Sequence, residues 1–141
     1  MSDNVLVETD FLFALRPSDS VHEAALNLLG DSSKSIVRLY ISPISSVESS
    51  LVMKASGLND KEISRALKAM EDAIRGYTIP RYPELTLTDL ALAAELRDKY
   101  GLTFFDSIHV SLALSKRLTY VSNDVRARKT VASEGGKTRP L

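Results

Sequence analysis

Four acidic residues have the types and the places along the chain that metal-dependent hydrolysis requires. They are Glu8, Glu48, Asp106 and Asp124. Carboxylates gathered in one cleft repel one another, and their proton affinities rise unless a cation neutralises them. Mg2+ and Mn2+ prefer such oxygen ligands, and one or two of these ions can activate water and polarise a phosphodiester. The four acids therefore predict a Mg2+ or Mn2+ site.

Basic residues gather near the last acids and would suit a polyanionic substrate. From Ser107 onward the chain has seven Lys or Arg residues against two acids, hence a net charge of +5, although the whole chain is neutral. The seven are Lys116, Arg117, Arg126, Arg128, Lys129, Lys137 and Arg139. Cations beside a metal site would attract phosphate groups. An ordinary solvated helix face and tail explains any single one of them equally well.

Two short strands lead toward the first two acids. Residues 4–8 are apolar, too short for a helix, and end at Glu8, which predicts a buried strand. Residues 36–41 are β-branched and aromatic, and Ser42 then predicts the N-cap of a helix that carries Glu48, with proline at the first helical position. Each strand is therefore followed by a turn or a helix with an acid.

The second half of the chain repeats this alternation. Thr103 is expected to cap a helix that contains Asp106, and residues 118–122 form a short strand before Asp124. Further helices are expected over 20–29 with a stop at Gly30, over 59–76 and over 86–100, and further strands over 77–79 and 137–141. The pattern predicts an α/β fold, a central mostly parallel sheet with helices on both faces. Ligands bind at the carboxyl ends of such strands, so one cleft should collect the acids.

Composition limits the remaining possibilities. With 141 residues, 44% hydrophobic and 26% charged, the chain is expected to form a single globular domain over 1–141. It has no cysteine and only two histidines, so a metal must be held mainly by oxygen. Neither a secretion signal nor an apolar run of about 20 residues is present, so we expect a cytoplasmic protein without membrane contact. Phosphate-binding glycine loops and a serine elbow between glycines are also missing.

Each acid also has a purely structural explanation. Glu8 and Asp10 could cap the turn after the first strand, and Asp106 has the capping-box spacing from its predicted cap. Asp124 could be the N-cap of the last helix, and Glu48 could be an exposed helical residue. Spacing alone leaves these alternatives open.

Four segments resemble the motifs of the PIN-domain family. Residues 5–12 (VLVETDFL) resemble its opening strand, which usually reads apolar-apolar-Asp-Thr-Asn, and residues 44–51 (ISSVESSL) resemble its second acidic motif. Residues 102–113 (LTFFDSIHVSLA) resemble the third motif, an Asp that leads an Ala-rich helix with a frequent His one turn on. Residues 118–124 (LTYVSND) resemble the fourth, in which Thr or Ser precedes Asp. The order and distances match over nearly the whole chain.

The resemblance implies a PIN-like fold and a Mg2+-dependent endoribonuclease, similar to the VapC toxins of VapBC toxin–antitoxin pairs. It implies an RNA substrate, frequent homodimers, and an antitoxin whose C-terminal segment occupies the active-site groove. Carried over by position, the resemblance assigns the acidic site to Glu8, Glu48, Asp106 and Asp124, with support from Thr9, Asp10 and Ser122. His109 would support the ligands from behind or serve only the fold.

One departure from the family pattern affects the first acid. That position is usually Asp, and the extra methylene of Glu8 moves its carboxylate by about 1.5 Å, a large change for the near-ideal octahedron of Mg2+. Asp10 is the residue that could compensate. Two alternatives therefore stay open, a PIN nuclease of RNA maturation and a PIN-fold binding protein with a weakened site.

Apolar residues between 42 and 76 predict a homodimer. They offer more apolar surface than one side of a sheet requires, unless all of them pack inside the monomer. The residues are Leu51, Val52, Met53, Ile63, Leu67 and Met70.

Overall fold

The central feature of the fold is a four-stranded parallel sheet. The structure, a computed structural model, describes residues 3–141. Its strands are β1 (Asp3–Val7), β2 (Val37–Ile41), β3 (Thr119–Val121) and β4 (Thr138–Arg139), and their order across the sheet is β2-β1-β3-β4. Every pair is parallel, with Val5 opposite Leu39 on one side and opposite Thr119 on the other. The predicted parallel α/β fold is confirmed.

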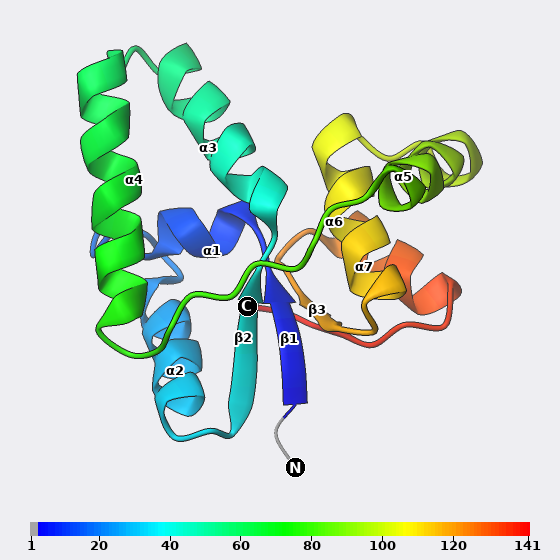
Figure 1. The fold of residues 1–141 in the computed structure, drawn as a ribbon, viewed down its shortest axis with the longest axis horizontal. Coiled ribbons are helices and arrows are strands. Elements are labelled where there is room, and N and C mark those ends of the chain that lie inside the picture. Colours follow the sequence, from blue (N-terminus) through cyan, green and yellow to red (C-terminus); the bar gives the residue numbers. More distant parts are fainter. Residues whose placement is uncertain (1–2) are drawn as a thin grey trace.

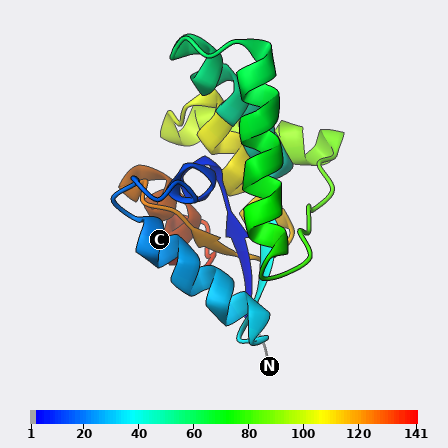
Figure 2. The same cartoon turned by 90° about the vertical axis from the view of Figure 1, so that its left-hand side faces the viewer.

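Seven helices surround the sheet within the described residues. They are α1 (Thr9–Ala14), α2 (His22–Ser33), α3 (Pro43–Ala55), α4 (Asp60–Arg75), α5 (Leu87–Tyr100), α6 (Phe104–Ser115) and α7 (Val125–Ser133). Figure 1 shows α3 and α4 as an arm on one side, α5, α6 and α7 on the other, and the α4–α5 connection crossing between them. Figure 2, seen from the side of the arm, has α1, α2 and α4 facing the viewer.

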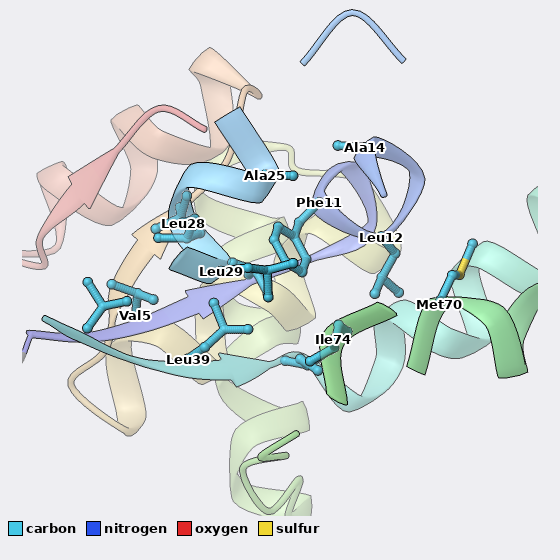
Figure 3. Close-up of a cluster of buried hydrophobic side chains, with 14 of the residues drawn as sticks. Val5, Phe11, Leu12, Ala14, Ala25, Leu28, Leu29, Leu39, Met70 and Ile74 are labelled. Carbon is cyan, nitrogen blue, oxygen red and sulfur yellow. The ribbon is translucent and has the colours of Figure 1, made fainter. Parts of the chain in front are cut away.

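The two faces of the sheet have separate hydrophobic clusters because side chains alternate along each strand. Val5 and Val7 point into the first cluster, which α1 to α4 cover, and Leu6 points into the second, which α5, α6 and α7 cover. Figure 3 shows the first cluster, where Leu29 of α2 packs beside the strands and Ile74 of α4 lies near their ends. Helices therefore cover both faces, as predicted.

Helix α1 was not predicted from the sequence. It begins directly after the N-cap Glu8 and buries Phe11, Leu12 and Ala14. A six-residue helix is too short to show a 3.6-residue repeat, so the apolar run after β1 gives no helical signal. Its position matters because it holds Thr9 and Asp10 in the first turn.

Two other predictions were wrong. Residues 77–79 form no strand, because the backbone amides of Tyr77 and Thr78 donate to the Ile74 carbonyl in a turn that closes α4. Gly30 does not end α2, which continues to Ser33, and the left-handed residue comes only at Ser35 with φ 61°. Glycine permits a helix stop but does not impose one.

Because Gly30 lies inside a helix, replacing it with alanine should stabilise the protein. A Cβ at this position would meet no heavy atom within 4 Å. We expect the free energy of unfolding to rise by about 0.5 to 1 kcal/mol, and the melting temperature by roughly 2 to 6 °C. Gly57→Ala is the matched control and should destabilise, since Gly57 has φ +97°. A Gly30→Ala variant that melts no higher than the parent would contradict this account.

Some of the apolar residues that were predicted to form a dimer interface are buried in the monomer, and others are exposed. Met53, Ile63 and Met70 are buried in the first cluster, and Leu67 packs partly buried against it. These four are therefore used inside the monomer, contrary to the prediction. Leu51 and Val52 on α3 stay exposed, at 55% and 44%.

Candidate metal centre

Three parallel strands have their carboxyl ends side by side, and we call this end of the sheet its carboxyl edge. Each strand is followed by a polar residue of the candidate site. Glu8 comes directly after β1, Ser42 after β2 and Ser122 after β3. All three are buried, and the backbone amide of Ser42 donates to the Val7 carbonyl at 2.9 Å. The parallel register thus places these residues side by side at the carboxyl edge.

Glu8 and Asp10 hold the turn that joins β1 to α1. Glu8 caps the helix, accepting a hydrogen bond from the Asp10 amide to its Oε1 at 2.9 Å. Asp10 Oδ2 accepts from the Asn123 amide at 2.7 Å and from the Ser122 hydroxyl at 3.4 Å. Asp10 therefore ties the end of β1 to the end of β3.

Glu48 reaches this edge from the second turn of α3. Its Oε1 accepts hydrogen bonds from the Thr9 hydroxyl and from His109 Nε2, the latter at 2.8 Å. His109 Nε2 also lies 3.8 Å from Glu8 Oε2, so one imidazole stands between two carboxyl groups. Ligand atoms of Glu8, Glu48 and His109 all lie within 4.8 Å of one another.

Asp106 lies in the first turn of α6, and Asp124 is the N-cap of α7. Thr103 caps α6, with the Asp106 amide donating to its hydroxyl at 3.4 Å. Asp124 caps α7 and accepts from the Ala127 amide at 3.0 Å, so its predicted capping role is real. The negative charge of Asp124 raises the pKa of Asp106, and that of Glu48 adds to it. Glu8 and Glu48 thus belong to the group whose ligand atoms lie within 4.8 Å of one another, whereas Asp106 and Asp124 do not. Asp106 is related to Asp124 and Glu48 through the effect of their charges on its pKa.

The acids differ in how easily they ionise. Burial raises the pKa of Glu8 to about 10, and the neighbouring Asp10 carboxyl adds to the effect. Burial is also the largest cause of the raised pKa of Asp106. Burial opposes ionisation of Glu48 as well, but hydrogen bonds from His109 and Thr9 outweigh it, so its pKa lies below the usual value. The metal-free site therefore holds an ionised Glu48 beside a protonated Glu8.

Two residues of this region were not singled out from the sequence. Ser42 was expected only to cap α3, yet its side chain makes no capping hydrogen bond and contacts His109 instead. Tyr120 of β3 is fully buried, and its hydroxyl has no hydrogen-bond partner. Burial raises the pKa of Tyr120 well above its ordinary value. Both depend on contacts between distant segments, which local patterns do not reveal.

The predicted basic flank does not form one surface. Lys116 is paired with the buried Asp89 at 3.3 Å, and Arg126 donates to the Tyr100 carbonyl at 3.0 Å. Arg117 and Lys137 precede β3 and β4, so they lie at the amino ends of the strands, whereas the acids lie at the carboxyl ends. Residues that precede a strand and residues that follow it lie at its opposite ends, so the length of the strands separates these cations from the acids.

A divalent cation fits the residues present. Among residues 3–141, no Lys or Arg forms an ion pair with the four acids or with Asp10. Asp10 Oδ1 and the Tyr120 hydroxyl are buried without partners, and the donor set consists mainly of carboxylate oxygens. Clustered carboxyl groups with unsatisfied oxygen atoms are the surroundings that a hard cation requires.

The protein is thus an α/β protein with a group of acidic residues at the carboxyl ends of its parallel strands. The sequence profile of the PIN domain matches residues 5–132. The chain belongs to the PIN-domain family. A comparison with curated protein sequences finds no match. None of the helices in the described part of the chain is long and apolar enough for a membrane crossing.

Solved structures confirm the fold. VapBC2 from Rickettsia felis, bound to a DNA fragment from its promoter, has a TM-score of 0.71 at 14% identity, covering 97% of this chain and 98% of that one. VapC20 from Mycobacterium tuberculosis, a toxin that cleaves the sarcin-ricin loop, has a TM-score of 0.62 at 22% identity, covering 94% and 95%. FitAcB from Neisseria gonorrhoeae has a TM-score of 0.59 at 20% identity, covering 95% of each chain.

Proposed function

We propose that the protein is a Mg2+- or Mn2+-dependent endoribonuclease and the toxin of a toxin–antitoxin pair. The observation that carries the proposal is the group of carboxyl groups at the carboxyl edge of a PIN-domain sheet, with no Lys or Arg of residues 3–141 paired to them. The proposed metal ligands and catalytic residues are Glu8, Glu48, Asp106 and Asp124. Thr9, Asp10 and Ser122 are the proposed supporting residues.

Each side chain has a distinct task in the proposed reaction. A bound Mg2+ or Mn2+ supplies Lewis-acid polarisation of a phosphoryl oxygen and activation of water. Glu48, ionised in the free protein, provides a carboxylate already held by Thr9 and His109. Glu8 would bind as a carboxylate, because the positive charge of a cation would offset the burial and the neighbouring carboxyl groups that raise its pKa. Asp106 and Asp124 complete the oxygen set from the other side.

Asp124→Asn separates the proposed catalytic role from the capping role. Asparagine caps helices about as well as aspartate, so the free energy of unfolding should stay within about 0.5 kcal/mol of the parent. Mg2+-dependent cleavage of a mixed RNA pool should fall by about 100-fold or more, because one carboxylate is lost. The measurement is RNA cleavage by gel, with thermal melting alongside.

Asp124→Ala is the matched variant, since it removes both roles. It should lose the same activity and also about 0.5 to 2 kcal/mol of stability. If a folded Asp124→Asn variant cleaved RNA as well as the parent, Asp124 would only cap α7 and would have no role in cleavage.

The proposed partners are RNA, an antitoxin protein and a second copy of the chain, all in the cytoplasm. The solved relatives VapBC2 and FitAB carry the names of such pairs, which motivates the antitoxin. For the dimer, α3 has three exposed apolar residues, Val47, Leu51 and Val52. We expect a solution mass of twice the chain mass of 15.5 kDa, and a Leu51→Lys variant of single mass. Light scattering of the parent at micromolar concentration that gives the single mass would refute the dimer.

A second candidate is a PIN-fold binding protein with a weakened site, and the observation that favours it is the buried, protonated Glu8. The two functions differ in metal binding. Calorimetric titration with Mn2+ should show binding at or below millimolar concentration for the nuclease, and none for a weakened site. A PIN nuclease of RNA maturation would share the chemistry and differ in its RNA target.

A further inference from the structure

A buried chain of hydrogen bonds runs behind Glu48. Ser42 Oγ lies 2.7 Å from His109 Nδ1, and His109 Nε2 lies 2.8 Å from Glu48 Oε1. Ser42 and His109 are both completely buried. The three residues come from the end of β2, from α6 and from α3, so the chain joins both sides of the sheet at its carboxyl edge.

The partners determine which atoms carry the protons. Glu48 Oε1 already accepts a hydrogen bond from the Thr9 hydroxyl, and a carboxylate oxygen accepts rather than donates, so His109 Nε2 is the donor to it. A neutral imidazole with its proton on Nε2 accepts at Nδ1, so the Ser42 hydroxyl donates there. The Ser42 hydroxyl has no other acceptor among residues 3–141, so its proton is available for this role.

We propose that Ser42 and His109 are positioning residues that hold Glu48, and that His109 is not itself a metal ligand. Glu48 Oε1 receives two hydrogen bonds, from Thr9 and His109, whereas Oε2 receives none from residues 3–141. The carboxylate is thereby fixed through one oxygen while the other stays available. The inference rests on the proposed function in one respect, that Glu48 binds the cation.

The competing arrangement makes His109 a ligand together with Glu8 and Glu48, whose ligand atoms lie within 4.8 Å of its own. A ligating Nε2 must lack a proton, and Nδ1 would then carry it and donate to Ser42. Mg2+ and Mn2+ also prefer oxygen over imidazole nitrogen. The two arrangements therefore require opposite tautomers of the same ring.

Nitrogen-15 NMR of the imidazole rings in the metal-free protein at pH 8 distinguishes the tautomers. The chain has two histidines, and the other, His22, has its Nδ1 2.8 Å from the Ala14 carbonyl, which requires a proton on Nδ1. We expect opposite tautomers, with the proton on Nε2 in His109 and on Nδ1 in His22, and Mg2+ should leave His109 unchanged. A proton on Nδ1 of His109, or loss of the Nε2 proton when Mg2+ binds, would overturn the proposal.

Mn2+ affinity without RNA, measured by calorimetry, tests the positioning role. His109→Gln keeps an N–H donor near the position of Nε2 and should bind Mn2+ within about 3-fold of the parent. His109→Met fills similar space without a donor and should bind about 10- to 100-fold more weakly, the range typical of residues that orient metal ligands. Ser42→Ala, which removes only the hydrogen bond to Nδ1, should weaken binding by at least about 3-fold while the proton stays on His109 Nε2.

Ser49→Ala is the matched control. Ser49 is equally buried in α3, and its hydroxyl donates to the Ser45 carbonyl rather than to the site. Its Mn2+ affinity should equal that of the parent. Parent-like affinity in both Ser42→Ala and His109→Met would overturn the positioning role. If the parent itself binds no Mn2+, the proposed function fails, while the tautomers still decide whether the hydrogen-bonded chain exists.

Discussion

Asp106→Asn is expected to remove Mg2+-dependent RNA cleavage while leaving the protein folded. Asp106 is a proposed ligand whose pKa responds to the charges of Asp124 and Glu48, and its loss should reduce cleavage by about 100-fold or more. The cap of α6 should survive, because Thr103 accepts the backbone amide of residue 106 rather than its side chain. RNA cleavage with Mg2+ or Mn2+ measures the effect.

The same variant should be slightly more stable than the parent in metal-free buffer at neutral pH. The pKa of Asp106 is raised in the folded protein, mainly by burial, so ionisation above its unfolded value of 3.8 opposes folding. The amide removes this opposition, although it also removes a favourable helix-dipole interaction of about 0.3 to 1 kcal/mol. Asp98→Asn on the exposed surface of α5 is the control and should change neither property. A destabilised Asp106→Asn variant that still cuts RNA would reverse the catalytic assignment.

Glu8→Gln should stabilise the metal-free protein by an amount that grows with pH. The pKa of Glu8 is about 10 in the folded state against an ordinary value of 4.5, so folding takes up a proton between these two values. The parent therefore loses stability as pH rises through this window, and has its full stability below it. Glutamine cannot ionise, and its amide oxygen can still accept the Asp10 amide, so the variant should lack this loss.

Melting curves from pH 5 to pH 9 with a chelator measure this effect. We expect the variant to melt clearly higher than the parent at pH 9 and by little at pH 5. Added Mg2+ should stabilise the parent and not the variant, because a ligand that binds only the folded state stabilises it. Glu95→Gln, on the exposed face of α5, should follow the parent at every pH. Parallel curves for Glu8→Gln and the parent would show that Glu8 ionises freely.

The strand ends and the acids could be predicted because both depend on local sequence. Apolar runs before Glu8 and Asp124 determine where the strands stop, and parallel pairing then brings the residues after them to one edge. Thr103 and Asp124 likewise cap helices through contacts only three residues long. Resemblance to the PIN-domain family then motivated the proposal that these acids also form a metal site.

The other features of the site and fold depend on contacts between distant segments, which the spacing of residues along the sequence does not reveal. Ser42 precedes proline in a common cap pattern, but the side chain binds His109, which lies 67 residues away. His109 itself has the spacing of an ordinary helix residue, and only packing against α3 reveals its contact with Glu48. Gly30 illustrates the reverse case, because packing of α2 on the sheet continues a helix past a residue that usually favours a stop.

The place of β1 in the sheet also sets the order of events while the protein is being made. Val5 pairs with Leu39, 34 residues later, but also with Thr119, 114 residues later. A growing chain that has reached residue 100 contains every buried residue of the first hydrophobic cluster except Val121. That half can fold first during synthesis, as N-terminal parts of proteins do, whereas Asp106, β3 and Asp124 have yet to be translated. A chain of that length can bury its first cluster but lacks two of the four proposed carboxylates, Asp106 and Asp124.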